Sequence, residues 1–400
     1  MVTSMSHDAP AYAPPSGDTW RDPFPMYAAL REHDPVHRVS DGRPELGYWV
    51  LTRHRDVLAA VHDHETFSSA QGLTTQYDEL ESIGLVDNPP MVMTDPPSHT
   101  EFRRLVSRGF TPRQVESLEP AVRSFVSARI DHLRDVGGGD IVVELFKPLP
   151  SMVVAHYLGV PEEDRDRFDA WTDAIVAANA AAAFTEVGDA IAELMGYFGE
   201  LIDRRRREPE DDTVSHLVAA GEAGDDAGIL RILAFTFTMV TGGNDTSTGL
   251  LGGGVQLLSE RPDQRKLALD DMDSTVEELL RLTSPVQGLA RTTTRDVTID
   301  GVTIPEGRKV LMCYGAANRD PDMYGADAEE LDVARNPRQI LTFSHGAHHC
   351  LGAAAARMMG RVALTELLQR IPDFRVDLDA VRWADGSYVR RPLTVPLEIL

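Results

Sequence analysis

One short segment late in the chain concentrates residues that could bind a metal or carry charge. It reads Phe343-Ser344-His345-Gly346-Ala347-His348-His349-Cys350-Leu351-Gly352. A helical pattern starts near Cys350 and runs to about Ile371, so we expect this cysteine where a glycine-containing loop meets a helix N-terminus. Backbone N–H groups and the helix dipole at such a position favour a negative charge and lower the pKa of a thiol. Gly346 and Gly352 would let the backbone approach a flat ligand closely.

Three kinds of site would use such a cysteine. A lone cysteine is commonly a buried structural thiol. Zinc is a second alternative, because His345, His348, His349 and Cys350 are crowded together. Zinc sites prefer two pairs of ligands separated by a loop, however, and no matching second pair is present. The third alternative, which we favour, is an axial thiolate ligand of haem iron, which promotes cleavage of the O–O bond.

A second group of reactive residues lies inside a very long predicted helix over residues 229–259. It reads Gly242-Gly243-Asn244-Asp245-Thr246. The two glycines remove side-chain bulk where a helix would pass over a flat cofactor. Thr246 can donate to a carbonyl one turn earlier and open the helical ladder, which leaves a groove for O2 and water. Asp245 and Thr246 could then relay protons there. The alternative is a close helix crossing with Asp and Thr on the surface.

Four basic residues could neutralise the two carboxylates of a haem, whose burial requires cationic or hydrogen-bonding neighbours. His99 and Arg103 are four residues apart on one face of a predicted helix over residues 98–109. Arg291 lies in a predicted strand, and His348 lies two residues before the cysteine. Each of these residues taken singly is more typical of an ordinary surface, so their weight comes from the set.

The order and spacing of these motifs resemble the cytochrome P450 family. The pattern Phe343-x-x-Gly346-x-His348-x-Cys350-x-Gly352 is similar to the haem-binding loop of that family, with Ser344 where many members have glycine. The glycine-acid-threonine segment resembles the family's oxygen-activation segment. His99, Arg103, Arg291 and His348 are similar to its propionate partners.

The resemblance also gives a meaning to Glu278 and Arg281, which are three residues apart on one helix face. Such a pair alone is common and usually marks a solvated face. In the family, the pair is joined to an arginine of a later meander. Arg335 or Arg338 could supply it here, and we choose Arg335, with a structural role for all three residues.

The resemblance implies haem b as the cofactor and a monooxygenase reaction with O2. The electrons would come from a ferredoxin and an NAD(P)H-dependent reductase, with Arg104, Arg108 and Arg357 as a basic docking patch. A peroxide-driven haem enzyme would manage without the relay of Asp245 and Thr246. A non-catalytic haem-binding or zinc-binding protein would have no use for this relay.

The substrate pocket is expected, by the same likeness, to draw on the long helix, a turn after the Glu278 helix, the irregular segment before Pro96 and the C-terminal tail. Because its side chains are mainly apolar, a lipid, steroid, terpenoid or polyketide-like substrate is expected. The expected pocket residues are Phe235, Thr238, Met239, Gly242, Val286, Leu289, Tyr388 and Val389.

The elements that must position these residues are mainly helical, with a minor β portion. Besides the two helices above, patterns predict helices over residues 24–33, 113–136, 143–158, 162–179, 185–207, 272–282 and 350–371. Short strands are predicted at 36–39, 48–51, 289–293, 297–299 and 309–312, near Arg375 and at 393–400. We expect a mobile lead over residues 1–17 and one domain over 18–400, folded as the family's triangular helical prism. The run of four arginines at 204–207 is expected to be a solvated helix end.

Composition excludes several classes of protein. The chain has 400 residues, 42% of them apolar, which is enough for a sizeable core. A net charge of −24 argues against nucleic-acid and anionic-lipid partners. Two cysteines fit a reducing cytoplasm, and Cys313 is expected to be a core thiol. We expect no signal peptide or membrane anchor, and a monomer.

Overall fold

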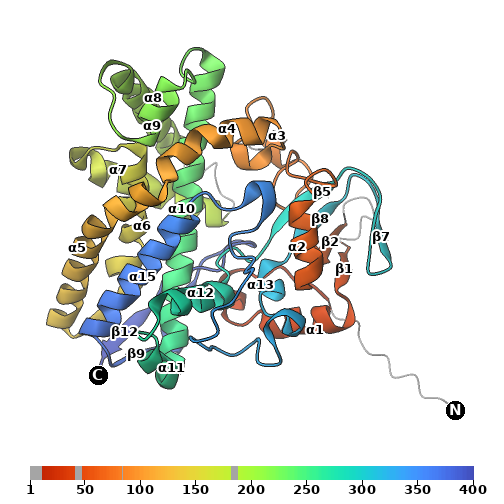
Figure 1. The fold of residues 1–400 in the computed structure, drawn as a ribbon, viewed down its shortest axis with the longest axis vertical. Coiled ribbons are helices and arrows are strands. Elements are labelled where there is room, and N and C mark those ends of the chain that lie inside the picture. The colour runs from red at the N-terminus through yellow and green to blue at the C-terminus, as the bar shows by residue number, and fades with distance from the viewer. Residues whose placement is uncertain (1–10, 41–46, 83, 182–187) are drawn as a thin grey trace.

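The computed structural model describes residues 11–40, 47–82, 84–181 and 188–400 (Figure 1). Helices form most of the chain, as the sequence predicted. Those of eight residues or more are α1 (Phe24–His33), α2 (His54–His62), α4 (Ser98–Val106), α5 (Pro112–Val136), α6 (Pro148–Leu158), α7 (Arg165–Ala181), α8 (Gly188–Arg207), α10 (Asp226–Glu260), α12 (Met272–Thr283) and α15 (Ala353–Arg370). Shorter helices are α3 (Glu79–Ser82), α9 (Thr213–Ala219), α11 (Pro262–Leu267), α13 (Tyr314–Ala317) and α14 (Pro321–Tyr324).

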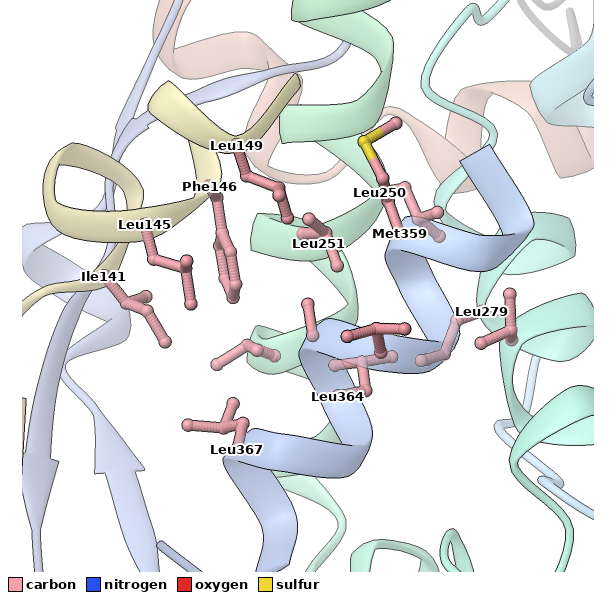
Figure 2. Close-up of a cluster of buried hydrophobic side chains, with 14 of the residues drawn as sticks. Ile141, Leu145, Phe146, Leu149, Leu250, Leu251, Leu279, Met359, Leu364 and Leu367 are labelled. Atoms are coloured by element: carbon pink, nitrogen blue, oxygen red, sulfur yellow. The ribbon is translucent and has the colours of Figure 1, made fainter. Parts of the chain in front are cut away.

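The longest helix, α10, runs through the middle of the molecule, with α15 and α12 beside it (Figure 1). Figure 2 shows the apolar side chains that hold these helices together. Leu250 and Leu251 of α10 meet Met359 and Leu364 of α15, and Leu279 of α12 closes one side. Because these side chains are almost entirely buried, α10 and α15 are held as one rigid pair. The residues on α10 and those just before α15 are therefore held at fixed positions relative to one another.

Strands form a smaller layer beside the helices (Figure 1). A five-stranded sheet has the order β1-β2-β8-β5-β3, from β1 (Val36–Val39), β2 (Tyr48–Leu51), β8 (Lys309–Met312), β5 (Leu289–Thr293) and β3 (Phe67–Ser68). Only β2 and β8 pair in parallel in this sheet. The other sheets are β4 (Gly138–Asp140), β12 (Pro396–Ile399) and β9 (Phe374–Val376), then β10 (Arg382–Trp383) with β11 (Pro392–Thr394), and β6 (Val297–Ile299) with β7 (Val302–Ile304).

Two local expectations need correction, and a third is not tested. The helix predicted over 143–158 is divided into a π-helix at Val142–Phe146 and α6, because Pro148 cannot donate a helical hydrogen bond. The four-arginine run is only partly solvated, since Arg205 is 2% exposed and pairs with Asp212 at 2.6 Å. The predicted start of α8 at residue 185 lies outside the described residues.

The expected mobile lead also changes. Residues 1–10 lie outside the described residues. The rest of the lead is anchored, because Tyr12 is buried edge-on to the ring of Tyr48 and its N–H donates to His37. A 3-10 helix then begins at Gly17. No helix in the described parts of the chain has both the length and the apolar composition needed to cross a bilayer.

Candidate active site

The cysteine loop is held by one backbone hydrogen bond and by one side-chain hydrogen bond to α12. Cys350 N donates to Phe343 O at 2.8 Å, and Thr342 Oγ1 donates to Leu280 O of α12 at 2.7 Å. The helix begins at Ala353, so Cys350 lies in the turn just before α15. Its side chain is exposed, although protein surrounds it on its other sides. A sulfur that is accessible in the interior of a molecule is what a ligand to a bound cofactor requires.

The protonation of this thiol differs from the expectation. Desolvation raises the pKa of Cys350 above its ordinary value, and it outweighs a hydrogen bond from the Gly352 backbone and the charges of Arg103 and Arg357. The predicted lowering is therefore wrong for the polypeptide alone, because the dipole of a helix that begins at Ala353 is too far away to offset burial. A metal cation at the sulfur would reverse this balance, since a coordinated thiol is deprotonated.

The two glycines of the loop have different roles. Gly346 has a φ of +66°, and a Cβ there would lie 2.8 Å from Val61 O. The backbone conformation and the packing against α2 therefore explain why this residue is a glycine. The expectation that Gly346 lets the backbone approach a ligand is wrong. A Cβ at Gly352 would have nothing within 4 Å, so the space around this position, two residues after the cysteine, is open.

The four predicted basic residues come together, and we call them the basic cluster: His99, Arg103, Arg291 and His348. The rings of His99 and His348 lie with their centroids 4.1 Å apart. Arg103 donates to His349 O, and Arg291 is 4% exposed. His348 Nε2 lies 3.1 Å from Ser69 Oγ. Helix α4, strand β5 and the cysteine loop each contribute to this cluster.

Burial and positive neighbours dominate the electrostatics of the basic cluster, although the charge of Asp95 opposes them at His99. Burial and the charge of Arg103 lower the pKa of His99 to about 4. Burial, Arg291 and His99 lower the pKa of His348 to about 3. Neither ring nitrogen of His99 has a hydrogen-bond partner among the described residues, although the side chain is buried. Unpartnered buried polar atoms are costly, so these residues fit a ligand that carries carboxylates.

Helix α10 presents an open position on one face. Gly242 is exposed, and a Cβ there would meet nothing within 4 Å. Thr246 Oγ1 donates to Gly242 O at 2.8 Å, which is the expected bond to the preceding turn, while α10 stays helical throughout. The exposed Cys350, the open Gly242 and the unpartnered His99 together fit a flat cofactor with two carboxylates, as haem has. Cys350 would then hold the iron and the basic cluster the propionates.

Asp245 lies about 100° around the helix from Thr246 and is not on the surface. It is 2% exposed, and its Oδ1 lies 2.6 Å from Nε of Arg391. The N–H direction is not aligned for a hydrogen bond, so we treat the contact as an ion pair. Burial raises the pKa of Asp245 to about 6, and the charges of Arg391 and Lys147 oppose this rise. Sequence reasoning missed Arg391, although a buried aspartate in an apolar helix signals that a cation must face it.

The other glycines of α10 serve packing. A Cβ at Gly249 would lie 2.9 Å from Arg390 O and 3.0 Å from the Cβ of Pro285. A Cβ at Gly252 would lie 2.6 Å from the Cγ of Pro392. The close-crossing alternative therefore holds for these glycines, while Gly242 leaves open space.

Glu278 and Arg281 are fully buried, so the solvated-face alternative does not apply to them. Arg281 donates to both carboxylate oxygens of Glu278, at 2.8 and 2.7 Å. Arg335 donates to Glu278 Oε1 at 3.1 Å, whereas Arg338 is exposed. Arg281 also donates to the carbonyls of Asn318 and Ala328. This network ties α12 to the segment that precedes the cysteine loop.

The predicted pocket residues fall into two groups. Thr238 and Met239 are partly buried and share a face of α10 with Gly242. Phe235 shares this face but is 2% exposed, and its ring lies edge-on to Phe102 in the core, with centroids 6.1 Å apart. It therefore belongs to the packing of α10 against α4.

The second group lies where the C-terminal turn meets the segment before β5. Val286 and Val389 form an isolated antiparallel bridge, and Gln287 N donates to Tyr388 O at 2.7 Å. Leu289, partly buried, starts β5. Because Pro285 and Arg390 touch α10 at Gly249, this group lies against α10 one turn after Thr246.

A half-open cavity of about 480 Å³ lies in the irregular segment before Pro96. Apolar Leu80, Val86 and Met93 line it together with Asp95 and Ser98. Ser98 is the neighbour of His99 in the chain, so this cavity adjoins the basic cluster. Neither Cys350 nor Gly242 lines the cavity, so it is distinct from the open positions on the cysteine loop and on α10. Among the residues that the structure describes, no three His, Cys, Asp or Glu side chains are arranged to hold a metal ion.

Comparison with known proteins agrees with the fold and shows the family of the chain. The model of the Cytochrome P450 family matches residues 262–382. The chain is 67% identical over 406 aligned residues to Cytochrome P450 130 of Mycobacterium tuberculosis, covering 100% of both chains. It is 37% identical to Vitamin D(3) 25-hydroxylase of Pseudonocardia autotrophica, covering 96% of this chain and 95% of the relative. Among solved structures, the bacillaene polyketide synthase cytochrome P450 PksS of Bacillus subtilis 168 superposes with a TM-score of 0.85 at 30% identity, covering 97% and 100% of the two chains. The chain therefore belongs to the cytochrome P450 family and is a haem b monooxygenase.

Proposed function

We propose that this cytochrome P450 hydroxylates a hydrophobic small molecule, of the lipid, steroid, terpenoid or polyketide-like class. The observation that carries the proposal is the apolar group of Val286, Leu289 and Val389, which lies against α10 at Gly249, two turns after the open position at Gly242 on the same helix. None of the eight pocket residues is charged. The names of two relatives, a vitamin D(3) 25-hydroxylase and a cytochrome P450 of a polyketide synthase, point to substrates of the same class.

The chain's residues divide the work of holding the cofactor. Cys350 would ligate the iron, and the basic cluster would neutralise the propionates by charge-assisted hydrogen bonds. When bound, haem supplies the site at which O2 is bound and activated. The Glu278–Arg281–Arg335 network would keep the cysteine loop in place, within a single oxygenase domain over residues 18–400.

Asp245 and Thr246 would manage protons. The hydroxyl of Thr246 donates to Gly242 O, so its lone pairs can accept a hydrogen bond from water, although α10 stays helical here and does not open the groove that the sequence predicted. Asp245, with a pKa raised to about 6 by burial, can take up and release a proton near neutral pH. Such a relay suits a reaction that consumes two protons and two electrons for each O2.

Electrons would come from a ferredoxin reduced by an NAD(P)H-dependent ferredoxin reductase. Arg104 and Arg108 are exposed, and they follow Arg103 of the basic cluster in the sequence. Arg357 is partly neutralised, because it donates to Glu277. The docking patch on this acidic protein would therefore depend mainly on Arg104 and Arg108.

Optical spectroscopy tests this proposal in two steps. The reduced, CO-bound protein should show a strongly red-shifted Soret band, and sterols, terpenoids, fatty acids and macrolides should then be screened for the spin-state shift that marks binding. The compounds that bind should be hydroxylated when ferredoxin, reductase and NAD(P)H are supplied. Thr246→Ala should lower the amount of product formed for each NAD(P)H consumed. Binding only of polar or charged compounds would contradict the substrate class. Equal turnover with peroxide alone, unaffected by Thr246→Ala, would indicate a peroxygenase.

A further inference from the structure

The Asp245–Arg391 ion pair connects α10 to the C-terminal turn that joins β10 and β11. Both side chains are almost fully buried, with 2% and 6% exposed, and the charged atoms lie 2.6 Å apart. Arg391 is the last residue of the turn, directly before β11. Tyr388 and Val389, two of the proposed pocket residues, lie three and two residues earlier on the same turn.

The backbone of this turn is held on several sides, so Arg391 has little freedom of its own. Arg390 N donates to Pro285 O at 2.8 Å, and Ala384 N donates to Arg391 O at 3.0 Å. Arg390 O packs against α10 at Gly249. A displacement at Val389 therefore reaches the Arg391 side chain through a short, hydrogen-bonded stretch of chain.

The other charges around Asp245 are fewer and weaker. Lys147, just before α6, is the second cation that acts on it, but Lys147 pairs with Asp173 at 2.9 Å and is 44% exposed. Arg390 makes other contacts: its Nε donates to Trp20 O, and its guanidinium lies over the ring of Trp383. Arg391 is thus the buried cation that faces Asp245, and it belongs to the turn that contains the proposed pocket residues Tyr388 and Val389.

We propose that Arg391 is a positioning residue that keeps the Asp245 carboxylate ionised and in place, and that it links occupation of the pocket at Tyr388 and Val389 to Asp245. The physical reason is that a buried carboxylate without a cation takes up a proton or moves to water. A substrate that shifts the turn changes the ion-pair distance and hence the proton affinity of Asp245. The inference rests on the proposed function, in which Asp245 manages protons.

The test uses the haem-loaded protein with Arg391→Gln, Arg391→Lys and, as a matched control, Arg382→Gln at an exposed position of the same hairpin. Infrared difference spectra against Asp245→Asn identify the carboxyl band and follow its titration. We expect Arg391→Gln to raise the pH of the Asp245 transition by at least one unit, Arg391→Lys to restore it largely, and Arg382→Gln to leave it unchanged. In the wild type, a spin-shifting apolar ligand should move this transition. A wild-type transition that does not respond to the ligand, or one that Arg391→Gln leaves in place, overturns the proposal.

Coupling of NAD(P)H use to product formation gives the second readout. If Arg391 acts through Asp245, the double variant Arg391→Gln/Asp245→Asn should couple no worse than Asp245→Asn alone. If Arg391→Gln causes the same fold-loss in both backgrounds, its role is only structural and the proposal fails. The proposed function fails separately, through a wild-type protein with no thiolate-type CO spectrum or through Asp245→Asn with wild-type coupling.

Discussion

The two cysteines have opposite surroundings, and this difference decides their roles. Cys313 is completely buried, and burial raises its pKa to about 12, so it is a core thiol as the sequence predicted. Cys350 is exposed beside the open position at Gly352. Burial opposes a thiolate at both residues, so a haem iron bound at Cys350, as proposed above, would have to stabilise the charge there more than the helix dipole does.

Replacing each cysteine by serine should therefore have separate effects. Cys350→Ser should remove the red-shifted Soret band of the CO complex and abolish monooxygenase turnover, with a circular dichroism spectrum close to that of the wild type. Cys313→Ser should keep the band but lower the free energy of unfolding by about 1–3 kcal/mol, because it buries a hydroxyl. A Cys350→Ser protein that retained the band would rule out this ligand.

The basic cluster explains how far sequence reasoning reached at this scale. His99, Arg103, Arg291 and His348 were predicted as a set from their chemistry and from a resemblance, and the fold brings them together. Arg391 and the buried Arg205 were missed, because an arginine's exposure depends on carboxylates that are distant or hidden in the fold. Spacing along one helix contains no such information.

Among the elements, α10 combines two uses of glycine that the sequence could not separate. Gly242 is open, whereas Gly249 is in contact with the C-terminal turn and with Pro285. In the cofactor-free protein, Gly242→Ala should raise the free energy of unfolding by up to about 1 kcal/mol through helix propensity.

Gly249→Ala should instead lower the free energy of unfolding by about 1–3 kcal/mol, because the added methyl group overpacks the contact. Urea unfolding of the two variants checks both signs. Stabilisation of Gly249→Ala would mean that the turn can move away from α10 without cost.

The tie between α12 and the segment before the cysteine loop gives another element-scale prediction. Arg335→Ala removes one of the two arginines that pair with the fully buried Glu278 and leaves Arg281 and the N–H of Asp332, so the free energy of unfolding should fall by about 1–3 kcal/mol. Haem content after purification should fall with it. Arg338→Ala, at an exposed neighbour, should change stability by no more than about 0.5 kcal/mol. Equal effects of the two variants would contradict the assigned partner.

Element boundaries were predicted best where periodicity is strong. The bounds of α1, β1, β2, β5, β6 and β8 agree with the sequence, and α5 and α12 differ by one residue. The π-helix at Val142–Phe146 and the short α2 and α9 were missed, since their apolar positions are set by tertiary contacts and are too few to show a period. The pairing of β2 with β8 joins residues about 260 apart, and local patterns contain no information on such partners.

For the whole molecule, the neutral histidines of the basic cluster predict sensitivity to acid. The pKa of His99 is about 4 in the folded chain and 6.5 when unperturbed, so the unfolded chain takes up a proton in this range that the folded chain does not. The contribution of His99 to stability is therefore present above pH 6.5 and lost as the pH falls towards 4. His348 acts in the same direction, at lower pH.

Urea unfolding of the cofactor-free protein from pH 7 to pH 4 should show this loss. The wild type should lose more stability than His99→Gln, by on the order of 1–3 kcal/mol. The holoprotein should be less sensitive, because propionates beside His99 raise its pKa. Parallel stability curves for the wild type and the variant would show that His99 does not titrate in this way.

The contacts between the two ends of the described chain have a consequence for biosynthesis. Gly17 N donates to Ala384 O at 3.1 Å, and Trp20 Nε1 donates to Gly386 O at 2.8 Å. The ribosome makes residues 17–20 more than 360 residues before these partners. A nascent chain that has reached Ile371 already contains the cysteine loop, α10 and the basic cluster, but it lacks the turn with Tyr388 and Val389. The pocket proposed above is therefore completed only when the last residues of the described chain have been made.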